Sequence, residues 1–596
     1  MPTAPSQWQV TEPEIKIAGT LLGGAIAVAS VITHNEYNKV PKAIISIYDG
    51  SPADQTFAAS EGTSPDLSPG GTVSIAFKDP GSGSSVTVFE GIIVSHAIRV
   101  RNRASLLVLE CKDKAVKMTV GKNTACFTKK KDSEVIQTLI GNSGLSATVD
   151  ATTDINPSLL QYDCSDWDFM VMRAEANGLI TSAKAGAVSV KKPSFSGSAS
   201  YSLTYGNNII EVEAEADART QVKGAKANSW APANQDLATS TKTAPATTVP
   251  DKPGNFGATT LAGVASPAQV TQVHLGQLTT AQLGTWAEAR MLKSRMARVK
   301  GRIKTYGFDV WPGDILNLDG VGARFDGDVL VTGVHHSLIG GEWLTEVQMG
   351  LSDRWHSELV NLHGVSHDSH HTLVPGLAAG VVKAIVEDPD SEYRVQVTIK
   401  TVAADADIWA RMVFVDAGSS RGHFYYPEIN DEVIIGFMGG DMAFPVILGQ
   451  LYSSKATPPL TPDKKNDQKG IFTRSGMKVL FDDKDKSILM STPGGNTVKI
   501  SDQDKTIALQ DLNSNKVTCD TSGITLDTPK DITLKATGNI NLQATQAINI
   551  KATTDCGIQG MNVNVQAQIA GSLKGATVEV NGSGMATIKG GMVMIN

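Results

Sequence analysis

The chain has 596 residues, more than a single hydrophobic core usually serves, so its length indicates several domains. A formal charge of −7, from 53 basic and 60 acidic residues, gives no strong field of one sign that would favour nucleic acid or an acidic membrane. Only 19% of the residues are charged and 56 are glycine, a balance typical of β structure with many tight turns.

Cysteine usage and the N-terminal sequence bear on where the chain folds. The cysteines are widely spaced and include no Cys-x-x-Cys pair, so neither a disulfide framework nor a zinc knuckle is expected. They are Cys111, Cys126, Cys164, Cys519 and Cys556. No basic stretch precedes an apolar core at the start, so we expect folding in the bacterial cytoplasm without a signal peptide. The uncharged run from Ala18 to Ile32 is short for a membrane span, and we interpret it as buried strands joined by a glycine turn.

Residues 1–370 form the first predicted region, in which strands dominate. The β-patterned runs are Ala43–Tyr48, Val73–Phe77, Val86–Val94 and Ala104–Leu109. Amphipathic spacing predicts helices at Ser133–Gly141, from near Asp166 to Gly178, and at Thr280–Val299. Residues 231–263 carry few large apolar side chains, and we interpret them as an inserted loop or linker.

A histidine cluster lies at the end of this region, in a polar stretch. Its members are His363, His367, His370 and His371. Such a cluster could ligate a metal, but no carboxylate or cysteine spacing reinforces it. We therefore predict no metal site and interpret the stretch as a linker.

Residues 371–455 have the pattern of a compact β domain. Its expected strands are Gly380–Glu387, Arg394–Lys400, Ala410–Val415, Glu432–Phe437 and Pro445–Gln450. This number of short strands suits a small Greek-key barrel of the oligonucleotide/oligosaccharide-binding (OB) type. Pro458 and Pro459 close the domain, and residues 456–477 are interpreted as a linker.

A β-repeat fills the predicted last domain, residues 478–596. Apolar/polar/apolar triplets first recur at steps of nine or ten residues, then at a strict step of eight from Ile524 to Ile550. Because neighbouring side chains on a strand point to opposite faces, each triplet sends two apolar side chains to one face. The inward residues of the strict repeat are Ile524, Leu526, Ile532, Leu534, Ile540, Leu542, Ile548 and Ile550.

Such a narrow apolar ribbon cannot bury itself, and its turns leave no room for a covering helix. Three identical chains around one axis solve the problem, because each supplies one wall of a triangular β-prism. A monomeric triangular solenoid is the alternative, but it needs about 18 residues per turn, far more than eight. We therefore predict a homotrimeric needle.

Motifs in the barrel resemble those of one known family. They are Gly380-Val381-Val382, Trp409-Ala410-Arg411, Gly422-His423-Phe424-Tyr425-Tyr426-Pro427-Glu428 and Pro445-Val446-Ile447-Leu448-Gly449. In the first region, Ser165-Asp166-Trp167-Asp168-Phe169 and Glu175-Ala176-Asn177-Gly178 resemble the phage-hub-like domain that precedes the barrel in that family. Together these residues are similar to VgrG-type central spike proteins of type VI secretion, contractile phage baseplates and extracellular contractile injection systems.

This resemblance implies a mainly β protein with phage-hub-like β-barrel domains, a few helices, an OB-fold barrel and a trimeric needle. It implies a structural spike at the tip of the inner tube, which nucleates tube and baseplate assembly and punctures the target envelope on sheath contraction. Inner-tube and baseplate proteins would bind the N-terminal hub, and effector cargo could ride on a phage-tail-like particle that is delivered or released extracellularly. The sequence ends in an apolar triplet, so the resemblance also implies a PAAR-type tip protein docked on Val593, Ile595 and Asn596.

Other functions were weighed against the spike. The sequence contains no His-Glu-x-x-His or phosphate-loop motif, and we predict no enzymatic activity and no cofactor. An OB barrel can bind single-stranded nucleic acid or glycan, but Phe424, Tyr425 and Tyr426 lack clustered Lys or Arg, so we interpret these aromatics as structural. A trimeric receptor-binding or tail-fibre protein is the remaining alternative, because fibres also use trimeric β-needles.

Overall fold

A computed structural model describes residues 3–7, 9–62, 65–78, 83–101, 104–231, 236–250, 256–264, 269–360, 376–401 and 407–595. The chain divides into two compact units, Met1–Pro458 and Pro459–Asn596. The histidine cluster expected at 363–371 lies outside the described residues. No helix of the described residues is both long and apolar enough to cross a membrane.

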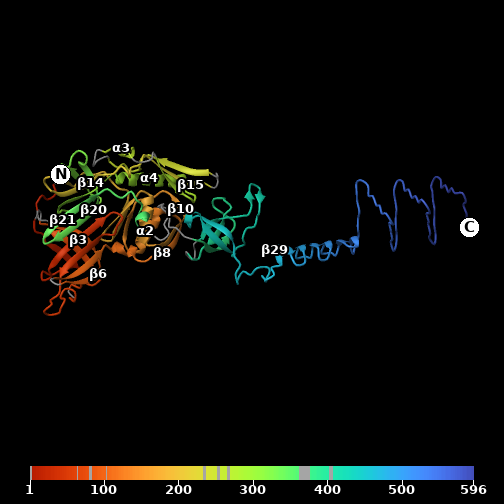
Figure 1. The fold of residues 1–596 in the computed structure, drawn as a ribbon, viewed down its shortest axis with the longest axis horizontal. Helices are drawn as coiled ribbons and strands as arrows, with labels where there is room; N and C mark the ends of the chain where they lie inside the picture. The colour runs from red at the N-terminus through yellow and green to blue at the C-terminus, as the bar shows by residue number, and fades with distance from the viewer. Residues whose placement is uncertain are drawn as a thin grey trace. The chain divides into compact units, whose positions relative to one another are not determined.

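A 13-stranded sheet is the framework of the first unit (Figure 1). Eight of its strands follow one another as antiparallel neighbours in the order β14-β18-β21-β20-β3-β4-β7-β6. Their bounds are β14 Ile209–Ala216, β18 Val299–Tyr306, β21 Glu342–Met349, β20 Gly327–Ile339, β3 Val28–Glu36, β4 Lys42–Tyr48, β7 Ala104–Lys112 and β6 Ser85–Arg101. The remaining strands are β5 Thr72–Lys78, β1 Pro13–Ile17, β2 Thr20–Leu21, β13 Tyr201–Thr204 and β19 Ile315–Asp319.

This sheet joins segments that are far apart in the sequence. β3 and β20 pair through His34 and His335, and they lie side by side in Figure 1. The alternating pattern of each strand places one face on apolar cores that contain Val31, Ile45 and Val334. The other face is partly exposed and carries both polar residues such as His34 and Lys42 and the apolar Ile32 and Ile44. The run after Ala18 forms β2, which is exposed, and the start of β3, so only part of it is buried as expected.

A second layer in this unit is built around helices. α1 Asp132–Asn142 and α2 Asp166–Ala176 pack together with β8 Asn123–Lys131, β9 Ser146–Val149, β10 Ile155–Cys164, β11 Ile180–Lys184 and β12 Ala187–Lys191. α2 begins where the sequence predicted, because Ser165 caps it by accepting a hydrogen bond from the Asp168 N–H. α1 begins one residue before the expected Ser133, because the Glu134 carboxylate accepts a hydrogen bond from the Lys131 N–H.

The expected linker at 231–263 is partly structured. β16 Asp236–Lys242 pairs with β15 Ala225–Ala231, which in turn pairs with β17 Val270–His274. α4 Thr280–Met296 packs on this small sheet, and α3 Ala258–Ala262 precedes β17. The linker interpretation was wrong for β16, because the strand holds a single large apolar residue, Leu237, and so shows no apolar alternation. α4 also ends earlier than expected, because β18 begins at Val299.

The barrel forms as the sequence predicted. Its closed order is β22-β23-β24-β28-β27, with bounds β22 Ala378–Ala384, β23 Val395–Thr398, β24 Asp407–Met412, β28 Pro445–Gln450 and β27 Glu432–Phe437. Alternate residues such as Val397, Ala410 and Ile435 fill its interior. Phe424 and Tyr425 are 83% and 57% exposed. The Phe424 ring lies 5.0 Å from that of Tyr426, which packs against the barrel core.

The second unit begins with a seven-stranded antiparallel sheet in simple sequence order. Its strands are β29 Gln468–Phe472, β30 Lys478–Asp482, β31 Ser487–Ser491, β32 Thr497–Ser501, β33 Thr506–Gln510, β34 Lys516–Asp520 and β35 Gly523–Asp527. Gln468–Phe472 pairs with β30, so pairing starts within the stretch that we had interpreted as a linker. After Asp527, residues 528–595 form no strand (Figure 1).

Candidate oligomerisation site

One face of the seven-stranded sheet is almost entirely apolar. Residues directly opposed in an antiparallel ladder share a face, so the register defines two columns along the sheet. The first column is Ile471, Val479, Met490, Val498, Leu509, Val517 and Leu526. The second is Lys469, Phe481, Ile488, Ile500, Ile507, Cys519 and Ile524. Lys469, in the first layer, is the one charged residue in either column.

The opposite face becomes polar toward β35. Its central column is Gly470, Leu480, Leu489, Lys499, Ala508, Thr518 and Thr525. From Lys499 onward no large apolar side chain stands in this column. The sheet from β32 to β35 therefore has one apolar face and one polar face. This pattern is typical of a sheet that covers a hydrophobic core on one side and faces water on the other.

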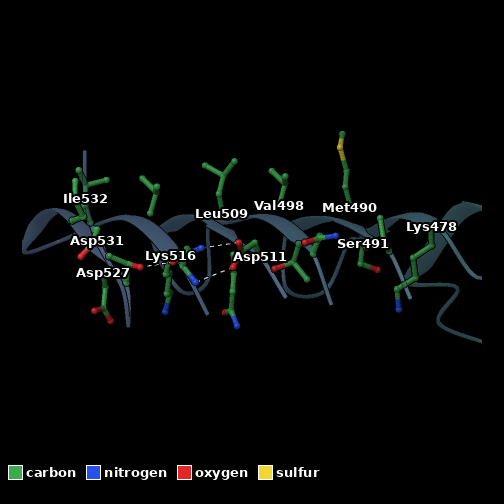
Figure 2. A pocket seen from close by; sticks show the side chains of 18 residues that line it. Lys478, Met490, Ser491, Val498, Leu509, Asp511, Lys516, Asp527, Asp531 and Ile532 are labelled. Atoms are coloured by element: carbon green, nitrogen blue, oxygen red, sulfur yellow. Dashed lines mark hydrogen bonds between the residues drawn. The ribbon is translucent and has the colours of Figure 1, made fainter. Parts of the chain in front are cut away.

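In a single chain the apolar face is left open to water. Met490, Ile500 and Leu509 are 42–49% exposed, and Ile524 reaches 76%. Figure 2 shows Met490, Val498, Leu509 and Ile532 projecting to one side of the ribbon, away from Lys516 and Asp527. These apolar side chains line an open groove of about 620 Å³. A continuous exposed apolar face of this length is typical of surfaces that bind another protein.

Hydrogen bonds between turns on the same side of the sheet fix the register of its strands. The Leu512 N–H donates to Asn496 Oδ1 at 3.1 Å, linking the β31–β32 and β33–β34 turns. Thr528 Oγ1 donates to Asn515 Oδ1 and so links the next turn. Within the middle turn, Asp511 accepts N–H bonds from Asn513 and Asn515, each at 2.9 Å. These bonds keep the apolar columns straight, because a one-residue slip would turn them to the polar face.

The predicted needle-core residues beyond β35 are exposed as well. Ile532, Ile540 and Ile548 are 51–53% exposed, and their partners Leu534, Leu542 and Ile550 are 64–70% exposed. Backbone bends recur at residues 529–530, 537–538, 545–546 and 553–554, so the chain itself repeats every eight residues. Within residues 528–595 no backbone-to-backbone hydrogen bond joins one unit to the next. These N–H and C=O groups need water or another chain as partners.

The expected tip residues are exposed at the end of the described chain. Val593 is 50% and Ile595 88% exposed, whereas Asn596 lies outside the described residues. The apolar residues of β29 to β34 were not among the predicted core residues. Their signal was present in the nine- and ten-residue triplets, but only the pairing register shows that both sets share one face.

A serine–histidine pair in the first unit has the geometry of a nucleophile and its base. Ser60 Oγ lies 2.7 Å from His96 Nε2, and His96 Nδ1 donates to the Leu67 carbonyl at 3.0 Å. An oxyanion site would need free backbone N–H groups beside Ser60. The N–H groups of Ala59 and Ser60 instead donate to the Asp49 carboxylate at 2.9 and 2.8 Å. This arrangement pins a loop to β6, and we infer no catalysis from it.

Two family models match the sequence. The Alg8 N-terminal domain matches residues 7–340, and the type VI secretion system/phage-baseplate injector OB domain matches residues 378–452, which contain the closed barrel. No curated protein matches.

Solved structures share the fold. One chain of the lidded Francisella PdpA-VgrG complex aligns with this protein with a TM-score of 0.51 and 11% sequence identity. The alignment covers 88% of this chain and 80% of the Francisella chain. A chain of the half-lidded complex aligns with a TM-score of 0.51 and 10% sequence identity. That alignment covers 88% of this chain and 89% of the Francisella chain. The mainly β fold with an OB barrel, expected from the resemblance to VgrG-type spikes, is confirmed. Because the first model spans residues 7–340, more than half of the 596 residues, the chain belongs to the Alg8 N-terminal domain family.

Proposed function

We propose that three copies of this chain assemble into the central spike of a contractile injection system. The observation that carries the proposal is the exposed apolar face of β29–β35, which continues into eight-residue units without partners in their own chain. Three such faces turned toward one axis bury the two apolar columns of every layer. The polar face and the turns remain in water, so no other cover is required.

The two parts of the needle would then pair differently. In β29–β35 each wall is already hydrogen-bonded within its own chain. In residues 528–595, the strand ladder would form between neighbouring chains, because an eight-residue unit is too short to return beside itself. The inward residues from Ile524 to Ile550 would form the core of this second part. We propose residues 478–596 as the needle, residues 371–455 as the OB domain and residues 1–370 as the hub.

The role on the axis follows from the order of the domains. A hub-like region, an injector-type OB domain and a β-needle follow one another along the chain, and one similar solved structure is a VgrG in complex with PdpA. The spike would nucleate the inner tube and baseplate through its hub and puncture the target envelope when the sheath contracts. It would do so mechanically, without catalysis or cofactor, after folding in the cytoplasm. A PAAR-type tip protein would cover Val593 and Ile595, and cargo would be carried by partners.

Light scattering on the purified full-length chain tests the assembly. We expect three times the chain mass of 62.9 kDa. A stable monomer with an ordered C-terminal unit would contradict the proposal. Labelled particles separate the spike from the alternative receptor-binding fibre, because a spike lies on the particle axis and a fibre at its periphery.

A further inference from the structure

Two histidines face each other where strands from the two ends of the first region meet in the large sheet. His34 of β3 lies directly opposite His335 of β20, although the two are far apart in the sequence. Their rings are stacked, with centroids 4.0 Å apart and an angle of 19° between the ring planes. Both residues are half-buried on the partly exposed face of the sheet. The pair therefore sits on two hydrogen-bonded strands and still borders solvent.

The ring nitrogens of this pair lack hydrogen-bond partners within the described part of the chain. Nε2 of His335 is buried and unpaired, and no hydrogen bond to the His34 ring is found among the described residues. The next residue, His336, differs, because its Nδ1 lies 2.9 Å from Thr345 Oγ1 and accepts a hydrogen bond from Trp343 Nε1 at 3.3 Å. A buried polar atom without a partner is unfavourable. The stacked pair thus lacks the contacts that hold a structural histidine such as His336.

Both imidazoles are neutral at neutral pH. Burial, together with repulsion by His335 and Lys42, lowers the pKa of His34 to about 4. Burial also lowers the pKa of His335. A histidine binds a metal ion through the lone pair that a proton would otherwise occupy, so the neutral form is the ligand. The pair is therefore in the form that binds metal.

Charged side chains of both signs surround the pair. Glu346 of β21 and Lys42 of β4 stand directly opposite the two histidines, one on each outer side. Glu36 follows His34 by two residues on the same strand face, and Lys39 forms an ion pair with its carboxylate. No group of three or more His, Cys, Asp or Glu side chains able to hold a metal is found among the described residues. The carboxylates can thus offset part of the charge of a cation, but the two imidazoles are its only protein ligands in the described chain.

The spacing of the rings suits a shared ion. Bonds of about 2.1 Å at a tetrahedral angle place two ligating nitrogens about 3.4 Å apart. The ring centroids are 4.0 Å apart, so the side chains need little displacement to reach this separation. Because each lone pair lies in the plane of its ring, the rings must turn out of their stacked orientation until their planes meet at the ion. Rotation about χ2 of histidine is soft, and the solvent on this face leaves room for it.

We propose that His34 and His335 bind one divalent transition-metal ion between them, with water in the remaining coordination positions. Imidazole nitrogen suits Zn²⁺, Ni²⁺ and Cu²⁺, and Cu²⁺ should bind most tightly. The ion would link β3 to β20 and so stabilise the junction between the two ends of the first region. It would be structural and would take no part in catalysis. The site lies within one chain, so it goes beyond the proposed spike and does not rest on the number of copies in the assembly.

Metal titration of the untagged full-length chain tests the site. The background for every measurement carries glutamine in place of the histidines that precede the barrel, which are His363, His367, His370 and His371. Calorimetry with zinc chloride should give about one ion per chain. The electron paramagnetic resonance spectrum with one equivalent of Cu²⁺ should show two imidazole nitrogens bound to the metal. The melting temperature should rise with the concentration of free Zn²⁺, because the ion binds only the folded chain.

Single substitutions locate the ion. His34→Gln and His335→Gln should each raise the Kd for Zn²⁺ at least about tenfold and remove the two-nitrogen signal of Cu²⁺. His423→Gln replaces an exposed histidine of the barrel and is the matched control, which should bind as the background does. His335→Cys provides a thiolate and should bind Zn²⁺ more tightly than His335→Gln, which a loss of folding would not allow.

The outcomes distinguish this site from the proposed assembly. Absence of Zn²⁺ binding in the background overturns the site. One bound ion that persists in both glutamine variants, or a Cu²⁺ spectrum without two imidazole nitrogens, also overturns it. Each of these results leaves the trimer intact, because the chain mass measures assembly separately. A monomer that still binds one ion per chain would overturn the trimer and support the metal site.

Discussion

The imidazole Nε2 of His356 lies 2.9 Å from Oδ1 of Asp168, and the two residues belong to segments far apart in the sequence. The backbone N–H of His356 also donates a hydrogen bond to the Glu175 carboxylate at 2.7 Å. The same carboxylate accepts a hydrogen bond from Lys293 Nζ at 2.7 Å. α2 therefore holds both α4 and the short helix α5 His356–Leu359. This contact accounts for Asp168 in the motif that begins at Ser165, whereas Asp166 accepts hydrogen bonds from Asn123 and Gln161.

Acid should weaken this junction. Burial alone would raise the pKa of Asp168, but hydrogen bonds from His356 and Ser165 and the attraction of His356 hold that pKa below its usual value. A lowered pKa stabilises the fold above the unfolded value of about 3.9, and the contribution is lost as pH falls through the folded pKa. Asp168→Asn should lower the melting temperature near neutral pH and have a smaller effect at about pH 3. A melting-temperature loss that is equal at both pH values would contradict this assignment.

The buried pair of Asp132 and Arg173 should be costly to break. Arg173 Nε and Nη2 donate to the Asp132 carboxylate at 2.7 and 3.0 Å, and both side chains are about 5% exposed. Asp132→Ala leaves the guanidinium buried without its carboxylate and should destabilise the first unit by about 3–5 kcal/mol in urea unfolding.

Replacing both members of this pair provides the control. Asp132→Leu with Arg173→Met removes both charges together and should recover much of the lost free energy of unfolding. If the double variant is as unstable as Asp132→Ala, packing rather than charge determines the cost.

Charges placed in the needle core should prevent assembly. Ile532→Asp with Ile540→Asp would bury several unpaired carboxylates per layer of the proposed prism, and size measurement by light scattering should show monomers. Thr533→Asp with Asn541→Asp is the matched control on the outward positions and should remain trimeric. Trimers from the first variant would refute the inward assignment.

Thiol labelling tests the proposed needle assembly without substituting any residue of the needle core. Cys519 lies in the second apolar column, and Cys556 follows Ile548 by one eight-residue step, so both should be protected from maleimide in the native assembly. Burial raises the pKa of Cys111 and of Cys164 to about 12, so those two thiols should also stay unreacted.

An introduced outward cysteine calibrates the labelling. Thr518→Cys places a thiol on the polar face beside Cys519 and should react readily. Peptide mapping assigns each label. Rapid labelling of Cys519 and Cys556 in the native protein would mean that the apolar face is not covered.

Local patterns predicted the elements with strong periodicity. α2 was found from its apolar spacing, and the five barrel strands were found from alternation between turn residues. Elements without clear apolar periodicity were not predicted from the sequence. β16 holds one large apolar residue, Leu237, and its place is fixed by pairing with β15 rather than by its own strand preference.

The amino-acid pattern is enough to predict that the C-terminal repeat carries an apolar face that one chain cannot bury, because an eight-residue period and side-chain alternation leave no other covering surface. The folded structure was needed to find that β29–β34 extend that face in register. It alone brought His34 and His335 together across β3 and β20. The first depends on the register of consecutive antiparallel strands, and the second on pairing between strands far apart in the sequence. Neither register can be read from one segment alone.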